Sequence, residues 1–511
     1  MRMYAVFLKR FTRNTRMATI RRQSIISVFF IYGGFLIGAV NVLYFFPKYF
    51  TPEQFGLTRL LLELALLLST LCGVGMVPVS IKFFPFFKKY LPDKKNDLLF
   101  VTLSITIAAL LIMMIALPAL KPIVIRKFGY RSPLFVQYFD LLYPLTIGMT
   151  LFSLYEGYAW ITRKTVLSNF LKEFFFRFLT TVLILAWVIG WIGDFSVFAK
   201  LFSWTYLPPL LLLVYYISKS REFPLNPQIS PVTKRIGGKM AGFGLALFAS
   251  AALNALAKTN DSIILASQST QGLTDTAVYN IATYLITLME VPQRSLTSAA
   301  TPQIAIAWRE RNFARLSSIY RKTALNLLVI GMGLISLILL NVKELIEFLG
   351  PTYAPIGVLI LILGIAKIID MGTGMNSQIL MLSKHWKIDL FSNMLFVVIS
   401  LVLNYFLTRR YGVEGPAYGT LIAICFFNLI RFVAIWKIYN LQPFSINNGK
   451  VIIIALACFF LARLIPDLGN LYVNVAIPSL VFVILYAITI LKLNISNDIS
   501  EVYKGLIKRF S

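Results

Sequence analysis

Apolar residues fill long, nearly unbroken runs along this chain, and short polar or basic segments separate them. The runs are about 20 residues long, the length that a helix needs to cross roughly 30 Å of hydrocarbon. A transmembrane β-barrel would instead show alternating segments of about 10 residues. The pattern therefore predicts an all-α integral membrane protein with about 14 transmembrane helices. The expected spans cover residues 24–46, 57–81, 98–119, 134–160, 166–190, 196–217, 238–265, 275–305, 323–342, 354–382, 388–407, 413–438, 450–466 and 471–491.

The charge of the chain supports this class and predicts an orientation. Hydrophobic residues make up 58% of the sequence and charged residues 14%, and the formal net charge is +28. The basic residues fall mostly between the apolar runs and in the first 22 residues, where the positive-inside rule uses them. We therefore expect both termini in the cytoplasm and no binding of nucleic acid. The basic loop from Lys121 to Arg131, on the predicted outer side, does not fit this rule.

The first six spans resemble the next six at an offset of about 220 residues. The segment 127–133 (KFGYRSP) matches 348–355 (FLGPTYAP), and 161–164 (ITRK) matches 382–385 (LSKH). A six-span unit repeated in tandem keeps its orientation, which predicts two lobes related by an axis along the membrane normal. We expect an N-lobe over residues 1–222, a C-lobe over 223–440, and two further helices with a tail over 441–511.

The stretch from Gly237 to Trp308 carries polar groups inside two of the apolar runs. Asn254, Lys258 and Asp261 share one helical face, and Glu290 and Arg294 flank Pro292. Charges at bilayer depth cost several kcal/mol unless they face a cavity or one another. In tandem-repeat transporters the ligand site lies near mid-membrane between the halves. The polar groups of this stretch are therefore expected to line a central cavity.

Other charges lie within the predicted spans and complete the candidate site. Arg59 and Glu63 are spaced i, i+4, Lys367 and Asp370 are spaced i, i+3, and Arg431 lies in the twelfth span. Such pairs can equally fasten helices together, and long cations can snorkel to the interface. The substrate-binding candidates are Arg294, Lys258, Asn254, Lys367, Arg59 and Arg431. The candidates for ion coupling or charge pairing are Asp261, Glu290, Glu63 and Asp370.

Catalytic and metal chemistry find no support in the sequence. It contains no Walker loop, HExxH motif, nucleophile elbow or paired cysteine set. The three cysteines lie inside apolar runs, and the single histidine, His385, lies in a basic loop. We therefore expect a protein that is not an enzyme and has no catalytic residue, metal site or cofactor.

Several segments resemble the oligosaccharide-lipid flippases of the polysaccharide transporter (Wzx-type) family, within the MATE-like flippase superfamily. Their order and spacing carry the resemblance, which covers the whole chain. The segments are FPKYFTPEQFG (46–56), DSIILASQSTQGLTDTAVYNIA (261–282), residues 302–322, LGPTYA (349–354) and YGVEGPAYGTL (411–421). Pro416 departs from the last motif, where a small residue is usual.

The resemblance implies 14 helices and alternating access for undecaprenyl-diphosphate-linked glycans. The expected function is therefore translocation of a polyprenyl-diphosphate-linked oligosaccharide across the bacterial cytoplasmic membrane, for surface polysaccharide synthesis. The expected partners are this glycan and the lipid bilayer. Coupling to H⁺ or Na⁺ and contact with polysaccharide polymerase machinery are compatible with it. An ion-coupled multidrug exporter and a peptidoglycan lipid-precursor flippase remain as alternatives.

Overall fold

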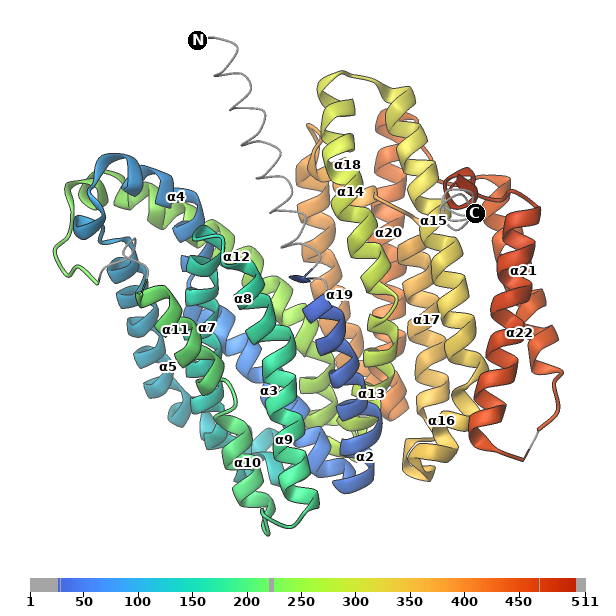
Figure 1. Cartoon of the computed structure of the whole chain (residues 1–511), viewed down its shortest axis with the longest axis horizontal. Helices are drawn as coiled ribbons and strands as arrows, with labels where there is room; N and C mark the ends of the chain where they lie inside the picture. Colours follow the sequence, from blue (N-terminus) through green and yellow to red (C-terminus); the bar gives the residue numbers. More distant parts are fainter. Residues whose placement is uncertain (1–25, 28, 220–224, 468, 502–511) are drawn as a thin grey trace. The chain divides into compact units, whose positions relative to one another are not determined.

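The computed structural model describes residues 26–27, 29–219, 225–467 and 469–501, and helices are the only regular structure in them (Figure 1). The all-α fold class expected from the sequence is therefore confirmed. The basic residues before the first span and at the C-terminus, on which the cytoplasmic placement of both ends partly rests, lie outside the described residues.

The chain divides into two compact units, Met1–Thr259 and Asn260–Ser511. The division falls inside the long helix α12 (Pro231–Gln268), later than the boundary at residue 222 that the sequence suggests. The first part of α12 packs within the first unit, because a Cβ on Gly75 would lie 2.3 Å from the carbonyl oxygen of Gly244. The last two helices, which the sequence sets apart, belong to the second unit.

The first unit is built from short and long helices around one apolar core. Residues 29–40 are helical and continue into η1. The elements that follow are η1 (Asn41–Phe45), α2 (Phe46–Tyr49), α3 (Pro52–Gly73), α4 (Met76–Tyr90), η2 (Asp93–Lys95), α5 (Leu98–Phe128), α6 (Pro133–Gln137), η3 (Phe139–Leu141), α7 (Leu142–Ile161), α8 (Thr165–Asn169), η4 (Phe170–Phe175), α9 (Phe176–Val188), α10 (Phe195–Ser203) and α11 (Leu207–Ser218).

Local sequence explains where α3 begins and ends. Thr51 and Gln54 form a reciprocal capping box, and Pro52 stands at the first helical position, where it loses no hydrogen bond. The helix ends at Gly73, and Val74 and Gly75 both take left-handed backbone conformations before α4 begins. A β-branched residue rarely adopts this conformation, so the second predicted span is two helices with a strained joint.

The second unit begins within α12 and ends with an apolar hairpin. Its remaining elements are α13 (Leu273–Thr287), α14 (Glu290–Arg309), α15 (Phe313–Leu340), α16 (Val342–Leu349), η5 (Pro351–Tyr353), α17 (Ile356–Gly372), α18 (Asn376–Met381), α19 (Trp386–Tyr411), η6 (Gly412–Glu414), α20 (Gly415–Tyr439), α21 (Ile446–Arg463) and α22 (Leu471–Lys492).

The hairpin α21–α22 is fastened to α15, beside which it lies (Figure 1). Buried apolar residues fill the contact, and the Tyr486 hydroxyl donates to the carbonyl of Val329 at 2.9 Å. Beyond α22, Asp498 accepts hydrogen bonds from Lys322 at 3.0 Å and from Asn326 at 2.9 Å. Apolar packing and polar contacts together therefore hold the last two helices to the second unit.

Ten helices in the described residues are long and apolar enough to cross a membrane, as judged by length and composition. One of them, Trp386–Tyr439, comprises α19 and α20 joined through η6. Helical segments at Leu142–Ile161, between Thr165 and Val188, and between Leu273 and Arg309 fall outside this criterion. With these three added and α19 separated from α20, helices occupy all the expected positions.

The basic segment Lys121–Arg131 mostly extends a helix. α5 continues through Lys121, Arg126 and Lys127 as far as Phe128, and Lys121 pairs with Asp140 at 3.2 Å. Since both side chains are well exposed, this pair adds little to stability.

Candidate functional site

Asp261 lies near the end of α12, in the part of this helix that belongs to the second unit. α12 ends at Gln268 and α13 begins at Leu273, whereas the expected spans end at residue 265 and begin at residue 275. The carboxylate of Asp261 accepts hydrogen bonds from the Tyr279 hydroxyl at 2.6 Å and from the Asn404 side chain at 2.5 Å. In the described part of the chain no lysine or arginine pairs with Asp261. Neutral hydrogen-bond donors from α13 and α19 therefore hold this carboxylate, in place of a cationic partner.

Glu290 and Arg294 lie in the first turns of α14, because the helix predicted over 275–305 is broken. α13 ends at Thr287, and α14 begins at Glu290. Pro292 stands in this first turn, where its missing N–H would have no intrahelical partner. A carboxylate is also favourable at a helix N-terminus, where the dipole is positive. The break therefore places Glu290 and Arg294 at the start of a helix in the interior of the expected span.

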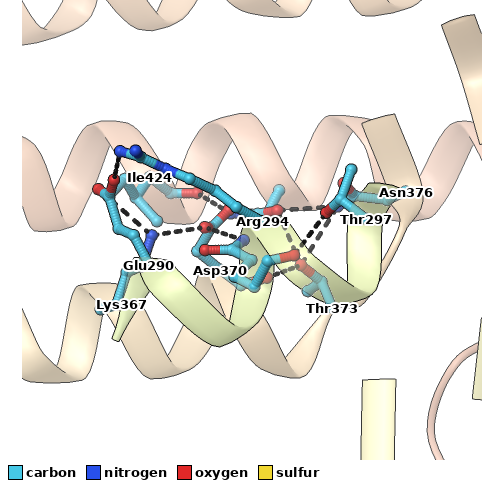
Figure 2. Close-up of polar contacts among 10 residues, drawn as sticks. Glu290, Arg294, Thr297, Lys367, Asp370, Thr373, Asn376 and Ile424 are labelled. Atoms are coloured by element: carbon cyan, nitrogen blue, oxygen red, sulfur yellow. Dashed lines mark hydrogen bonds and ion pairs between the residues drawn. The ribbon is translucent and has the colours of Figure 1, made fainter. Parts of the chain in front are cut away.

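The pair joins a longer array of alternating charge (Figure 2). Arg294 Nη2 lies 2.6 Å from Glu290 Oε2, and Lys367 Nζ lies 3.7 Å from Glu290 Oε1. Lys367 Nζ also lies 3.5 Å from Asp370 Oδ2, to which Gln293 donates at 2.9 Å. Two cations and two carboxylates thus link α14 to α17 with no net charge.

Exposure differs sharply along this array. The Arg294 side chain is 71% exposed and the Lys367 side chain 13%. An arginine at bilayer depth that is not covered by protein would be costly against lipid, so it is expected to face water or a ligand. Arg294 is therefore the group of this array best placed to meet an incoming anion.

A neutral hydrogen-bond chain continues from the array towards α18 and α20. Thr373 Oγ1 donates to Asn428 Oδ1 at 2.8 Å, and Asn376 donates to the same oxygen at 2.8 Å. Asn428 in turn donates to the carbonyl of Ile424 at 3.1 Å (Figure 2). The charged array thus lies next to polar contacts that join α17, α18 and α20.

Arg431 forms a further, buried ion pair and also interacts electrostatically with Asp370 of the array. Its Nη2 is 2.5 Å from Asp389 Oδ1 on α19, and its Nε donates to Ser392 Oγ at 3.0 Å. The side chain is 4% exposed, and its guanidinium lies 3.6 Å from the Phe427 ring centre. Its predicted contact with substrate would require Arg431 to leave these partners.

The remaining candidates belong to the first unit. Asn254 and Lys258 are exposed on α12, and Asn254 donates to the carbonyl of Ser250. Arg59 and Glu63 are partly buried on α3, and the Arg59 guanidinium lies 5.3 Å from the Phe46 ring and 5.1 Å from the Phe55 ring. Their convergence with Arg294 on one cavity remains a prediction.

Four charged residues of the first unit were missed by the sequence analysis. Lys172 pairs with the buried Glu156 at 2.8 Å, and Arg177 pairs with Glu173 at 3.2 Å. The sequence feature that could have identified them is their charge, because they lie within the predicted spans 134–160 and 166–190. Lys172 and Glu173 lie in the π-helical turn η4, which adds a residue relative to α-helical periodicity. Helical spacing alone could not pair Lys172 with Glu156.

The site offers ion pairing and hydrogen bonding to a charged ligand. In the residues that the structure describes, no three histidine, cysteine, aspartate or glutamate side chains group as metal ligands. The groups at hand are an exposed guanidinium, a mostly buried ammonium and the two carboxylates that balance them.

Solved structures show which fold this arrangement belongs to. The lipid II flippase MurJ in an inward closed conformation matches with a TM-score of 0.69 and 15% identity, covering 92% of this chain and 99% of that one. The chain has a known transporter fold. An inward-facing MATE multidrug transporter of the MOP superfamily matches with a TM-score of 0.58 and 15% identity, over 82% of this chain and 94% of that one.

A further MATE multidrug transporter, DinF-BH, matches with a TM-score of 0.53 and 13% identity, over 82% of this chain and 95% of that one. No family model and no curated protein sequence matches the chain. The all-helical transporter fold expected from the family resemblance is confirmed by these structures, whereas the Wzx-type assignment remains a prediction.

Proposed function

We propose that the protein is a flippase that moves a polyprenyl-diphosphate-linked oligosaccharide across the bacterial cytoplasmic membrane by alternating access, for surface polysaccharide synthesis. The observation that carries this proposal is the 71% exposure of Arg294, a cation within the expected span 275–305 that a single carboxylate holds at 2.6 Å. A lipid diphosphate is anionic, and arginine matches phosphate oxygens with a planar fork of donors.

The array around Arg294 suits an anion that must be bound and later released. Arg294 would take the diphosphate, and Lys258 and Asn254 remain the further donors expected from the sequence. The sugars could not cross hydrocarbon unaided, so they would need a polar path while the polyprenyl tail stays in lipid. Both termini would lie in the cytoplasm, as the loop charges indicate.

A peptidoglycan lipid-precursor flippase and an ion-coupled multidrug exporter are the other candidates, since solved structures of both kinds share this fold. A lipid II carrier would use the same cationic site for the same diphosphate chemistry. A multidrug exporter for cationic drugs would favour acidic groups without a cationic partner; Glu290 and Asp370 are paired with cations, whereas Asp261 accepts hydrogen bonds from neutral donors.

Coupling to H⁺ or Na⁺ is assigned to Asp261 in this proposal. Its carboxylate is held by the neutral donors Tyr279 and Asn404, so a proton or a small cation could bind without first displacing a lysine or arginine. Moving one charge through 100 mV supplies about 2.3 kcal/mol. That is enough for a bias of roughly fifty-fold between the two sides of the membrane.

Substitution of Arg294 tests the proposal in cells whose surface polysaccharide depends on this protein. Arg294→Ala should abolish surface glycan while the protein remains inserted, and Arg294→Lys should retain part of the export because it keeps the charge. Lys343→Ala serves as a control, since Lys343 is 75% exposed in a pair with Asp467 away from the array. Export by Arg294→Ala at the wild-type rate would refute the cationic-site mechanism.

A further inference from the structure

One carboxylate, that of Glu290, is shared between two cations. Its Oε2 lies 2.6 Å from Arg294 and its Oε1 lies 3.7 Å from Lys367. The first distance is that of a short charge-assisted hydrogen bond, and the second is longer than such a bond. The exposed cation thus has the tight contact with Glu290, while the mostly buried cation has the loose one.

We propose that an anionic phosphate bound at Arg294 releases Glu290, which closes on Lys367 and draws it away from Asp370. This inference rests on the proposed function, because it takes a diphosphate as the ligand of Arg294. No bond is made or broken in this step beyond ion pairs and hydrogen bonds, and no proton is transferred. Lys367 acts as a positioning residue, since it serves the ligand through Glu290.

The two contacts of Lys367 make this exchange feasible. Its ammonium lies 3.7 Å from Glu290 and 3.5 Å from Asp370, so neither carboxylate holds it closely. A mostly buried ammonium is stabilised when one counter-charge comes closer, and the flexible stem of Lys367 lets it approach either carboxylate. Asp370 can lose this partner because it keeps the hydrogen bond from Gln293 at 2.9 Å.

Through this exchange, binding of a ligand at Arg294 would change contacts between other helices of the second unit. Asp370 lies one turn before Thr373, whose hydroxyl bonds Asn428 on α20 at 2.8 Å. Asn376 at the start of α18 donates to the same Asn428 oxygen. The Thr373 hydroxyl also lies 2.9 Å from the backbone carbonyl of Asp370, so a shift of Asp370 would reach these contacts of α18 and α20.

A double-mutant cycle on ligand affinity tests the exchange. The probe is geranylgeranyl diphosphate in detergent micelles, and the uncharged control is geranylgeraniol. Binding is measured for the purified full chain as wild type, Arg294→Ala, Glu290→Gln, Lys367→Met and the double variant Glu290→Gln/Lys367→Met. Lys367→Met should weaken diphosphate binding about tenfold when Glu290 is present, because the released carboxylate then has no cation to receive it. In the Glu290→Gln background the loss should be less than about twofold.

Each other result counts against the inference in a defined way. An equal loss in both backgrounds would show that Lys367 merely adds positive charge, and it would overturn the exchange while leaving the proposed function intact. Two results would overturn the proposed function and the exchange together. In one, the wild type binds the diphosphate no more tightly than the alcohol; in the other, Arg294→Ala binds the diphosphate as tightly as the wild type does.

A second cycle covers the case in which Lys367→Met does not fold. Asp370→Asn removes the other partner of Lys367 and so favours its closure on Glu290. It should tighten diphosphate binding several-fold with Glu290 present and leave affinity unchanged in the Glu290→Gln background. Tightening of the same size in both backgrounds would contradict the exchange.

Discussion

Replacement of Arg431 separates two roles for this residue, as a substrate contact and as a structural partner. Arg431 and Asp389 form an ion pair at 2.5 Å with side chains 4% and 12% exposed. In Arg431→Met the Asp389 carboxylate keeps hydrogen bonds from Ser377 at 3.0 Å and Asn393 at 3.4 Å but loses its counter-charge. Removing one partner of a buried pair costs about 3–5 kcal/mol.

The structural role predicts a characteristic pattern across variants. Arg431→Met should unfold at markedly lower temperature, and Arg431→Met/Asp389→Asn should recover most of the loss, because no buried charge is left unpaired. Lys437→Met is the matched control, since Lys437 is exposed on the same helix and its loss should change stability by less than about 0.5 kcal/mol. The measurements are thermal unfolding of purified protein followed by tryptophan fluorescence, together with surface glycan at matched expression.

The same experiment can refute this reasoning. If Arg431→Met is as stable as wild type and yet exports no glycan, Arg431 meets the substrate, as its place in the twelfth span suggested. If Arg431→Met is unstable and the double variant restores both stability and export, the pair fastens α19 to α20.

Three further predictions concern the joint in the first unit, the hairpin clamp and the topology. Gly75→Ala should destabilise the protein by about 1–3 kcal/mol, because its φ is +68° and the new Cβ would meet the Gly244 carbonyl oxygen at 2.3 Å. Gly73→Ala should not destabilise the protein, because a Cβ at this position would meet no atom within 4 Å. Equal melting temperatures of the two variants would contradict the close packing of Gly75 on Gly244. Burial acts to raise the pKa of Asp498, but hydrogen bonds from Lys322 and Asn326 hold it below its ordinary value of 3.8. A carboxyl group whose pKa is lowered on folding stabilises the protein at pH values above its ordinary pKa, and this stabilisation is lost as the pH falls through the lowered pKa. Asp498→Asn should therefore melt at a lower temperature than wild type at pH 7, and the two melting temperatures should converge near pH 3. A difference in melting temperature that stays constant with pH would count against a stabilising role for the contacts of Asp498 with Lys322 and Asn326. Reporter fusions at Ser511 and within residues 270–274 should report cytoplasm and exterior, and equal signals would exclude the expected topology.

The helices were predictable because hydropathy and length carry the information that a membrane imposes. Apolar runs predicted the positions of the helices, and the gap between the expected spans 238–265 and 275–305 contains the turn between α12 and α13. Joints inside the segments were harder to predict. The break at Val74–Gly75 needs the close approach of Gly244, which is remote in sequence, and the two-residue break before Glu290 places Pro292 in a first turn rather than in a helix interior.

Pairs along one helix were predictable from the sequence, and links between helices were not. Glu290–Arg294 and Lys367–Asp370 follow from i, i+4 and i, i+3 spacing. The contact of Lys367 with Glu290 joins α14 to α17, and the contact of Lys172 with Glu156 joins a π-helical turn to α7. Without the three-dimensional path of the chain, a charge within a span shows that a partner is needed without showing which residue provides it.

The balance of charge in the array bears on how a transporter could release an anion. A guanidinium without a counter-charge would hold a diphosphate more strongly than a paired one, and tight ground-state binding would slow its departure on the far side. Arg294 is already paired with Glu290 at 2.6 Å, so a phosphate gains only the difference between two ion pairs. The same carboxylate can reclaim the guanidinium when the ligand leaves. Glu290 would thus lower affinity and speed release, which suits a site that must be emptied in every cycle.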